Sequence, residues 1–319
     1  MKQIALKFLS NVKYKSSFGF YISLILHKIY TLLKYNFLPS QRFIKKKYFE
    51  VFGKTLDLES PITLNEKIQW YKFHFKHPLI TQCADKYEVR SYVSEKIGAE
   101  YLVPLLFHTQ NPKEIIPENL PDIPFIIKAN HTAGTNHIIK DKSNVNWKYI
   151  QTDCKWWLHL NYYYIDKEWQ YDKITPRIVV EKLLTDTNGQ IPFDYKLHYF
   201  DGKFEFLQVD IDRFILHKRN IYDKDWNLLP FTWSILDKNG FPVWNNGIDI
   251  ERPKNLDLLI SLGEKLAQPF PYVRVDFYLL DNEIYFGELT FHHGGGFEHF
   301  TPYEWDYYFG KKLPLVDIM

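Results

Sequence analysis

The chain has 319 residues, of which 45% are hydrophobic and 18% are aromatic, and its formal net charge is +2 at pH 7. This length suits one large domain or two to three small ones, with enough apolar residues for a sizeable core. Its two cysteines, Cys83 and Cys154, exclude a disulfide framework and a cysteine-rich zinc site.

The first 50 residues are basic, with ten Lys and Arg and a single acid, Glu50. The apolar run from Phe18 to Leu38 is interrupted at helical spacing and is too broken for a membrane-spanning helix. Two alternatives fit this segment: a helix lying on an anionic membrane surface, or a helix packed on its own domain with solvated lysines. Nucleic acid is not an expected partner, because the basic residues do not interleave with an obvious binding fold.

Several elements follow in chain order. A capping box of Thr63 and Glu66 opens a predicted helix over 64–75, and a second helix over about 85–97 ends at Gly98. Further along we expect a strand at 101–107, a helix within the Trp- and Tyr-rich stretch 145–172, a strand at 177–184, a hairpin of strands 194–200 and 203–211 turning at Asp201-Gly202, and a helix at 255–267.

The stretch 124–136 joins a short apolar strand to a loop of small polar residues. Lys128 would supply a point charge for phosphate, and Gly134 would let backbone N–H groups approach an anion. The order is not that of a Walker A motif, because the lysine precedes the glycine. The alternative is that a strand ending in lysine before a turn arises by chance.

The stretch 274–291 alternates as two strands of a hairpin. If the loop is 281–283, Leu280 faces Ile284, Asp276 lies opposite Glu288, and one face is apolar throughout. A two-residue loop would shift the register and place Glu288 on the apolar face, which is costly.

On the predicted register, the polar face of this hairpin carries two carboxylates, Asp276 and Glu288, together with Arg274. Two carboxylates at cross-strand distance repel each other unless a cation lies between them, and hard oxygen ligands with room for phosphates suit Mg²⁺. The alternative is that these carboxylates pair with surface lysines.

Three glycines follow the second strand, in the run 292–296, and suggest backbone donors lying against a ligand. Because adjacent histidines on a strand point in opposite directions, one of His292 and His293 is assigned to a substrate or phosphate role. A last helix is predicted with Thr301 as N-cap and Pro302 as its first residue.

Together these stretches resemble the TupA-like ATP-grasp family of bacterial surface-polysaccharide loci, over roughly residues 45 to 311. The motifs that carry the resemblance are TLNEKIQWYK at 63–72, ADKYEVRSYV at 84–93, FIIKANHTAG at 125–134, VVEKLL at 179–184, DYKLHYFDGK at 194–203 and VDFYLLDNEIYFGELTF at 275–291. The resemblance implies an ATP-grasp fold, in which two α+β subdomains grip ATP. We therefore expect a basic segment at 1–50 and a catalytic region at 51–319, with its N-terminal part at 51–123 and the ATP-grasp subdomains at 124–319.

The resemblance also implies residue roles. Lys128 would hold the phosphates under a flexible loop containing Gly134, and the other nucleotide-binding residues would be His131, Glu181, Leu183 and Lys196. Asp276 and Glu288 would bind Mg²⁺, and Arg274 and Lys128 would act on the transferring phosphate. His292 is also predicted to be a catalytic residue. The substrate-binding residues would be Asp212, Arg213, His293, Gly294 and Gly295. Thr290 stands where many relatives have an asparagine ligand, which leaves open whether one or two Mg²⁺ bind.

The implied chemistry is carboxylate–amine ligation through an acyl phosphate, with a sugar carboxylate such as a uronic acid and an amino acid or other amine as substrates. One alternative is a glycosyltransferase, for which Asp210-Ile211-Asp212 has the metal-binding spacing, although it lies in a later hairpin. Another is a non-catalytic membrane adaptor, against which the intact acidic pair argues. The expected location is the cytoplasm, with peripheral attachment to the inner face of the membrane through residues 1–50 if the first alternative for that segment holds.

Overall fold

The computed structural model describes residues 12–211, 217–280 and 283–316, and the chain divides into two compact units. Unit 1 comprises residues 1–43, 85–87 and 104–183, and unit 2 comprises 44–84, 88–103 and 184–319. The two units are interleaved along the chain, whereas the division expected from the sequence is linear. Each unit is α+β, as expected, and each is described below by itself.

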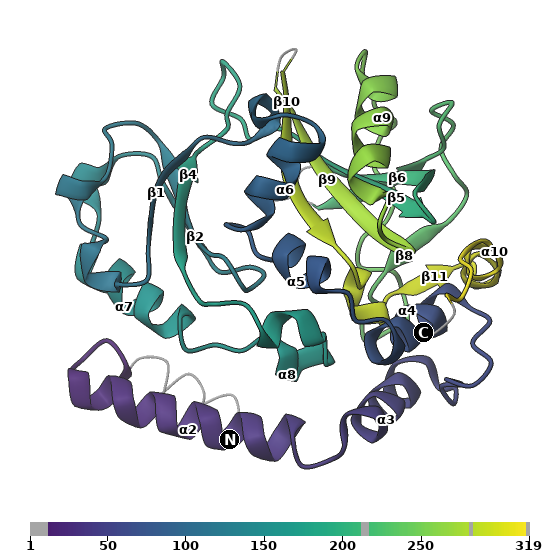
Figure 1. Cartoon of the computed structure of the whole chain (residues 1–319), viewed down its shortest axis with the longest axis horizontal. Coiled ribbons are helices and arrows are strands. Elements are labelled where there is room, and N and C mark those ends of the chain that lie inside the picture. The colour runs from purple at the N-terminus through teal and green to yellow at the C-terminus, as the bar shows by residue number, and fades with distance from the viewer. Residues whose placement is uncertain (1–11, 212–216, 281–282, 317–319) are drawn as a thin grey trace. The chain divides into compact units, whose positions relative to one another are not determined.

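Unit 1 is built on an antiparallel four-stranded sheet in the order β1-β4-β2-β3 (Figure 1). Its strands are β1 Leu105–Thr109, β2 Phe125–Ala129, β3 Asn136–Ile139 and β4 Ile178–Lys182. Its helices are α2 Ser17–Tyr35, α7 Trp147–Trp157 and α8 Tyr163–Asp166, with short 3-10 turns at Pro112–Glu114, Pro117–Asn119, Lys142–Asn144 and Trp169–Asp172. The Trp- and Tyr-rich stretch is therefore broken into two helices and a turn.

The core of unit 1 joins the sheet to α7. Alternate side chains of β2 are buried with the apolar side of α7, and the cluster includes Phe125, Ile127, Ala129, Ile150, Cys154 and Trp157. This period-two burial explains why 125–129 forms a strand, and it leaves the intervening Lys128 on the other face of the sheet.

Unit 2 is built on a five-stranded antiparallel sheet in the order β10-β9-β5-β6-β7. Its strands are β5 Asp194–Phe200, β6 Lys203–Ile211, β7 Lys218–Tyr222, β9 Tyr272–Leu280 and β10 Glu283–Thr290, with a separate pair formed by β8 Thr232–Ser234 and β11 His299–Thr301. Its helices are α4 Leu64–His74, α5 Pro78–Ala84, α6 Val89–Lys96, α9 Leu256–Ala267 and α10 Glu304–Lys312, with 3-10 turns at Ala99–Tyr101 and His293–Gly296. The helix α3 Ser40–Phe52 crosses the boundary between the units.

The two faces of the unit 2 sheet differ in character. The face toward α9 is apolar, with Val275, Leu197 and Val209 fully buried, and Figure 1 shows α9 lying along β9 and β5. Alternation then forces the intervening residues, such as Asp276 and Lys196, onto the opposite face. One face thus forms the core, and the other is available for polar chemistry.

Local signals in unit 2 gave correct predictions at several points. Thr63 and Glu66 form both hydrogen bonds of the capping box. At the β5–β6 turn, Asp201 and Gly202 have φ of 49° and 72°, as a type I′ hairpin turn requires. The predicted N-cap at Thr301 is wrong: Thr301 belongs to β11 and the helix starts at Glu304. Because β11 pairs with β8, Thr301, the residue predicted to cap the helix, is part of a strand instead.

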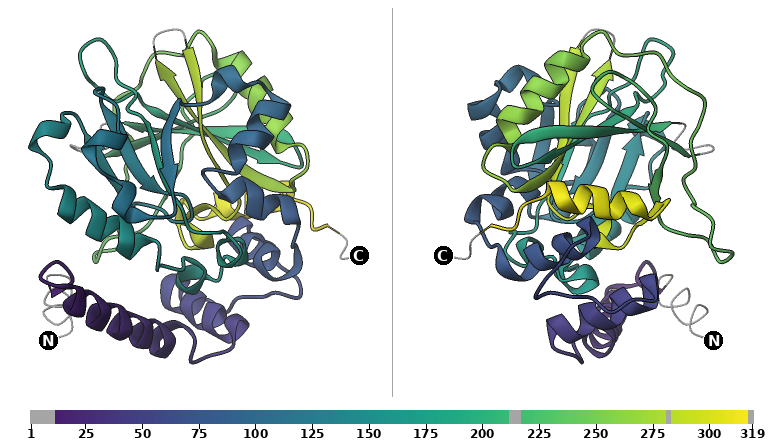
Figure 2. Two further views of the ribbon diagram at one scale, coloured as in Figure 1. Left: turned by 60° about the vertical axis from the view of Figure 1, so that its left-hand side comes forward. Right: turned by 90° about the vertical axis from the view of Figure 1, so that its right-hand side faces the viewer.

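Within the part of the chain that the structure describes, no helix combines the length and the apolar character needed to cross a bilayer. The expected helix in the basic N-terminal segment is present as α2, which is capped by Ser16 through a hydrogen bond from the Gly19 N–H. It lies along the α7 side of unit 1 (Figure 2). On one side of α2 these contacts agree with the alternative in which the segment packs on its own domain, and the membrane-surface alternative stays a prediction.

Candidate functional site

The β9–β10 hairpin has the predicted pairing but not the predicted loop. Asp276 lies opposite Glu288 and Arg274 opposite Thr290, as expected. However, Leu280 pairs with Glu283, so the connection has two residues, 281 and 282, instead of three. A β-bulge between Phe286 and Glu288 inserts Gly287 and restores the register. The bulge, and not the loop, keeps Glu288 off the apolar face.

Gly287 is well suited to this bulge because there is little room for a side chain. A Cβ at this position would lie 3.1 Å from the carbonyl oxygen of Asp276 and 3.3 Å from its Cβ. Either approach is tighter than an ordinary van der Waals contact. The glycine therefore allows the close strand contact that places Glu288 beside Asp276.

Polar side chains occupy the face of the unit 2 sheet that is turned away from α9, and they form rows across its strands. The first row comprises Glu288, Asp276, Lys196 and Gln208, and the next comprises Asp194, Asp210 and Arg219. Apart from Glu288, these residues are buried. We call this set, together with Arg274, His293 and Glu298, the ionic face.

Arg274 joins the two predicted metal ligands. Its Nε and Nη2 donate to the two carboxylate oxygens of Asp276 at 2.6 and 2.7 Å, and the same Nη2 donates to Glu288 Oε1 at 2.8 Å. Burial alone would lower the pKa of Arg274, but the two carboxylates raise it. A guanidinium nitrogen thus contacts both carboxylates, in the bridging position expected of a cation.

Lys196 lies among three carboxylates. Its Nζ is 3.1 Å from Asp194, 3.3 Å from Asp276 and 3.6 Å from Asp210. Burial alone would lower the pKa of Lys196, but these carboxylates together raise it. Lys196 is therefore charged at neutral pH, and it is held beside the predicted metal ligands through the cross-strand pairing of β5 with β9.

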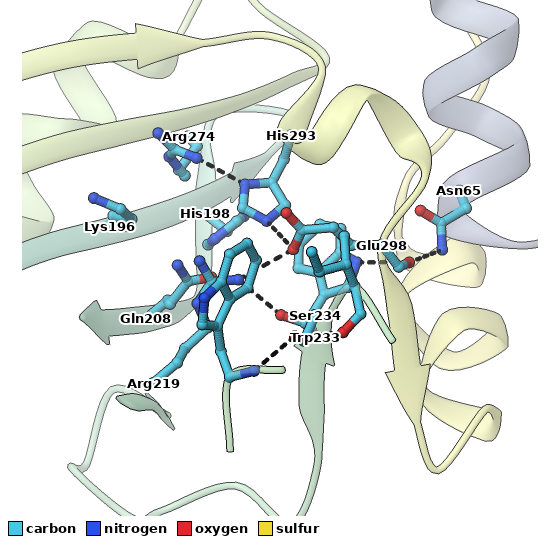
Figure 3. A network of polar contacts seen from close by, with 12 residues as sticks. Asn65, Lys196, His198, Gln208, Arg219, Trp233, Ser234, Arg274, His293 and Glu298 are labelled. Carbon is cyan, nitrogen blue, oxygen red and sulfur yellow. Dashed lines mark hydrogen bonds and ion pairs between the residues drawn. The ribbon is translucent and has the colours of Figure 1, made fainter. Parts of the chain in front are cut away.

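A chain of contacts extends the ionic face to the glycine-rich turn (Figure 3). Arg274 Nη1 lies 2.8 Å from His293 Nδ1, His293 Nε2 lies 3.2 Å from Glu298, and Arg219 Nη1 donates to Glu298 at 3.1 Å. Since arginine can only donate, Nδ1 of His293 accepts and Nε2 carries the proton toward Glu298. Burial is the main cause that lowers the pKa of His293, so the ring is neutral.

Arg219 and Glu298 were not predicted from the sequence. Arg219 Nε also donates to Asp210 at 3.0 Å, and although burial would raise the pKa of Asp210, Arg219 helps to hold it well below its usual value. Glu298 follows the three glycines by two residues, and this proximity was the only sequence signal. Arg219 and Glu298 are 79 positions apart, so no local pattern could reveal their contact.

The glycine-rich turn is held from behind by α4. Gln69 Nε2 donates to the carbonyl oxygens of Gly295 and Gly296 at 2.9 Å each, and Lys72 Nζ donates to Gly295 at 2.6 Å. Gly294, Gly295 and Gly296 have φ between 55° and 68°, a conformation that L side chains rarely adopt. These bonds hold the turn that carries His293 in place. The substrate role of Gly294 and Gly295 stays a prediction.

In unit 1, the predicted phosphate-binding lysine is paired with the predicted hinge glutamate. Lys128 Nζ lies 2.8 Å from Glu181 Oε2, across the antiparallel pairing of β2 with β4. Both side chains are largely shielded. The sequence placed these two residues in separate motifs, and the structure brings them together.

The turn after Lys128 is tied to its surroundings. The buried Asn130 side chain donates to Asp85 at 2.8 Å and accepts from the Arg177 N–H at 2.7 Å. Burial lowers the pKa of His131 to about 4, so its ring is neutral at pH 7. His131 is thus a buried residue of the turn, and its contact with nucleotide stays a prediction.

Gly134 has φ of 72°, and no atom lies within 4 Å of a Cβ built on it, so its backbone conformation and not crowding favours glycine. At the end of β4, the Leu183 N–H donates to the Pro124 carbonyl at 3.1 Å. This bond occupies the Leu183 amide, and the contact of Leu183 with adenine stays a prediction.

Two predicted substrate residues, Asp212 and Arg213, lie outside the described residues. His292 is buried next to His293. The predicted joint action of Lys128 and Arg274 on the transferring phosphate involves residues of different units, so it stays a prediction.

A protein-family model described as "TupA-like ATPgrasp" matches residues 66–314. No curated protein sequence matches the chain. Among solved structures, D-alanine–D-alanine ligase from Bacillus anthracis is 15% identical, with 66% of this chain and 57% of that chain covered and a TM-score of 0.37. The enzyme of that name from Helicobacter pylori is 12% identical, with 79% and 67% covered and a TM-score of 0.41. The ATP-grasp ligase PsnB, complexed with a minimal precursor, is 12% identical, with 72% and 59% covered and a TM-score of 0.36. The chain thus spans little more than half of the first of these proteins.

Proposed function

We propose, from the premise that the chain belongs to the TupA-like ATP-grasp family, that it is an ATP- and Mg²⁺-dependent ligase that joins a carboxylate to an amine. Family membership also confirms the ATP-grasp fold expected from the sequence motifs. The observation that carries the proposal is the ionic face of unit 2, where Arg274 bridges Asp276 and Glu288 beside Lys196.

The donor set of this face fits a divalent cation. In its ion pairs the carboxylates outnumber the lysine and arginine side chains, because five acids, Asp194, Asp210, Asp276, Glu288 and Glu298, are matched by Lys196, Arg219 and Arg274. This excess of negative charge, which is buried except at Glu288, favours a further cation. Among the described residues no group of three or more His, Cys, Asp or Glu could hold a metal ion alone. The neighbouring carboxylates of Asp276 and Glu288 suit Mg²⁺, which commonly takes one or two carboxylates and completes its coordination with phosphates and water.

Asp276 and Glu288 would hold the ion, which when bound would neutralise phosphate charge. Arg274 would then offer its guanidinium to the transferring phosphoryl group, and Lys196 would keep Asp276 in place. Lys128 would bind the nucleotide phosphates in place of its present contact with Glu181. The chain supplies position and charge, and no side-chain nucleophile is needed.

The reaction proposed has two steps. A substrate carboxylate oxygen attacks the γ-phosphorus of ATP, so that the bond to ADP breaks and an acyl phosphate forms. The amine nitrogen then attacks the acyl carbon, phosphate leaves with the C–O bond electrons, and the nitrogen loses a proton to give the amide. We propose a uronic acid as the carboxylate and an amino acid or other amine as its partner, from the polysaccharide setting that the family resemblance implies, with His292, His293 and the glycine turn near the substrates.

The test is ADP formation by the full chain with ATP, Mg²⁺, pooled uronic acids and pooled amino acids, with hydroxylamine added in parallel to trap an acyl phosphate as a hydroxamate. We expect ADP formation that requires the carboxylate, and a hydroxamate of the same sugar acid. The same assay is run on the Asp276→Asn variant, which should lose ADP formation. Its matched control is Glu283→Gln, which alters an exposed carboxylate of the same hairpin. Turnover of sugar nucleotides without ATP would instead support the glycosyltransferase alternative and contradict the proposal.

A further inference from the structure

One side of α2 is fixed to unit 1. Lys13 Nζ and the Tyr14 hydroxyl, just before the helix, donate to the buried Asp153 of α7 at 2.8 and 2.5 Å. The ring of Phe20 packs edge-on against Trp156 with a centroid distance of 5.9 Å. These contacts hold the helix in one orientation, with Gly19, Phe20, Ser23 and Leu24 buried.

The opposite side of α2 is apolar and exposed. We call it the outer face, and its residues are Phe18, Ile25, Leu26, Ile29, Leu32 and Leu33. At 100° per residue these positions span an arc of about 120°, and every α2 residue within that arc is apolar. Solvated surface helices usually carry polar residues there, so this arc indicates a binding surface.

The charge around the outer face indicates what it binds. From residue 12 to residue 49 the chain has lysines and an arginine but no acidic residue. Lys15, Lys28 and Lys34 are exposed, and Lys28 lies about 40° from the edge of the arc. A second copy of the chain would bring these lysines toward one another with no acid in the segment to pair them, so self-association is disfavoured.

We propose that the outer face of α2 binds the surface of an anionic lipid bilayer, with the helix axis in the plane of the interface. A broad apolar face flanked by lysines is the pattern of interfacial helices, because the apolar side chains enter the acyl boundary while the ammonium groups stay among anionic headgroups. The helix has 19 residues, which gives a contact about 28 Å long. This proposal does not depend on the catalytic one.

The test is sedimentation of the full chain with vesicles of phosphatidylcholine alone, or of phosphatidylcholine mixed equally with phosphatidylglycerol, at low and high salt. We expect binding to the anionic vesicles only, weakened by salt. The variant Ile25→Gln, Ile29→Gln, Leu32→Gln changes three side chains that are 56%, 48% and 58% exposed. It should keep the wild-type fold and bind anionic vesicles at least about 100-fold more weakly.

Two further variants separate the causes. Lys28→Gln should weaken binding about fivefold, the factor that corresponds to about 1 kcal/mol for each basic residue near an anionic surface. Ile248→Gln, at an apolar residue of unit 2 that is 80% exposed, should bind like the wild type.

Three results would overturn the proposal: a full chain that stays in solution with anionic vesicles at low salt, a triple variant that binds as well as the wild type, or equal binding to neutral vesicles. If the wild type instead forms a dimer and does not bind vesicles, and the triple variant is a monomer, the outer face would be assigned to contact with a second copy of the chain.

Discussion

Replacing Asp276 with Asn removes one charge from the ionic face without changing the size of the side chain. Arg274 would lose two charged hydrogen bonds of 2.6 and 2.7 Å but keep Glu288, and Lys196 would keep its other two carboxylates. Removing one partner of a buried pair costs about 3–5 kcal/mol when the other charge is left alone. Because both cations keep partners and acids are in excess, we expect a loss of about 2 kcal/mol.

Urea unfolding of wild type, Asp276→Asn and the control Glu283→Gln measures this loss. If Asp276 also holds Mg²⁺, the variant should lose the rise in melting temperature that Mg²⁺-ATP gives the wild type, and its ATP turnover should fall at least about 100-fold. The control should match the wild type in all three measurements. An unfolding free energy within about 0.5 kcal/mol of the wild type would refute the buried ion pairing, and unimpaired turnover would remove Asp276 from the mechanism.

Three further predictions concern single side chains. Burial raises the pKa of Asp306 to about 6 from an ordinary value of 3.8, so the folded protein keeps a proton that the unfolded chain releases between these values. The free energy of unfolding should therefore fall by roughly 2 kcal/mol as the pH rises from about 4 to about 6, out of roughly 3 kcal/mol over the whole transition. Urea unfolding curves should show this dependence flattened in Asp306→Asn; identical pH profiles would contradict it. Gly287→Ala should cost about 1–3 kcal/mol in urea melts, because the added methyl crowds Asp276, and a fully stable variant would speak against a constrained bulge. Lys128→Met should raise the KM for ATP at least about tenfold in steady-state assays, whereas an unchanged KM would exclude a phosphate contact.

Features decided within a few residues were predictable from the sequence. The capping box at Thr63, the turn at Asp201-Gly202 and the alternation of β9 each depend on neighbours in the chain, and each was predicted correctly. The opposition of Asp276 and Glu288 was also predicted, from the requirement that one face of the hairpin be apolar.

The way in which the hairpin satisfies that requirement was not predictable. Either a three-residue loop, or a two-residue loop followed by a bulge, places Asp276 opposite Glu288. The alternation pattern does not distinguish between these two arrangements. Gly287 was the available signal, because a glycine inside a strand often marks a bulge. The start of the last helix was misjudged for a related reason, since the residues from His299 to Thr301 pair with a distant strand.

Some ion pairs of the ionic face lay beyond sequence reasoning because they join residues far apart in the chain. Arg219 and Glu298 are separated by 79 positions. Neither lies in a recognisable motif, and the contact arises only when β7 and the glycine-rich turn are brought to the same face of the sheet. Alternation places such residues on a polar face but does not say which of them meet.

The most direct test of the central claim, that the ionic face of unit 2 is a Mg²⁺-ATP site, is a crystal structure of the full chain with Mg²⁺ and a non-hydrolysable ATP analogue. We predict a metal ion about 2.1 Å from a carboxylate oxygen of Asp276 and of Glu288, with the remaining ligands from phosphate and water. Arg274 should then face a phosphate oxygen. A nucleotide bound with its phosphates away from these two carboxylates, while Arg274 keeps its present hydrogen bonds to both of them, would contradict the claim.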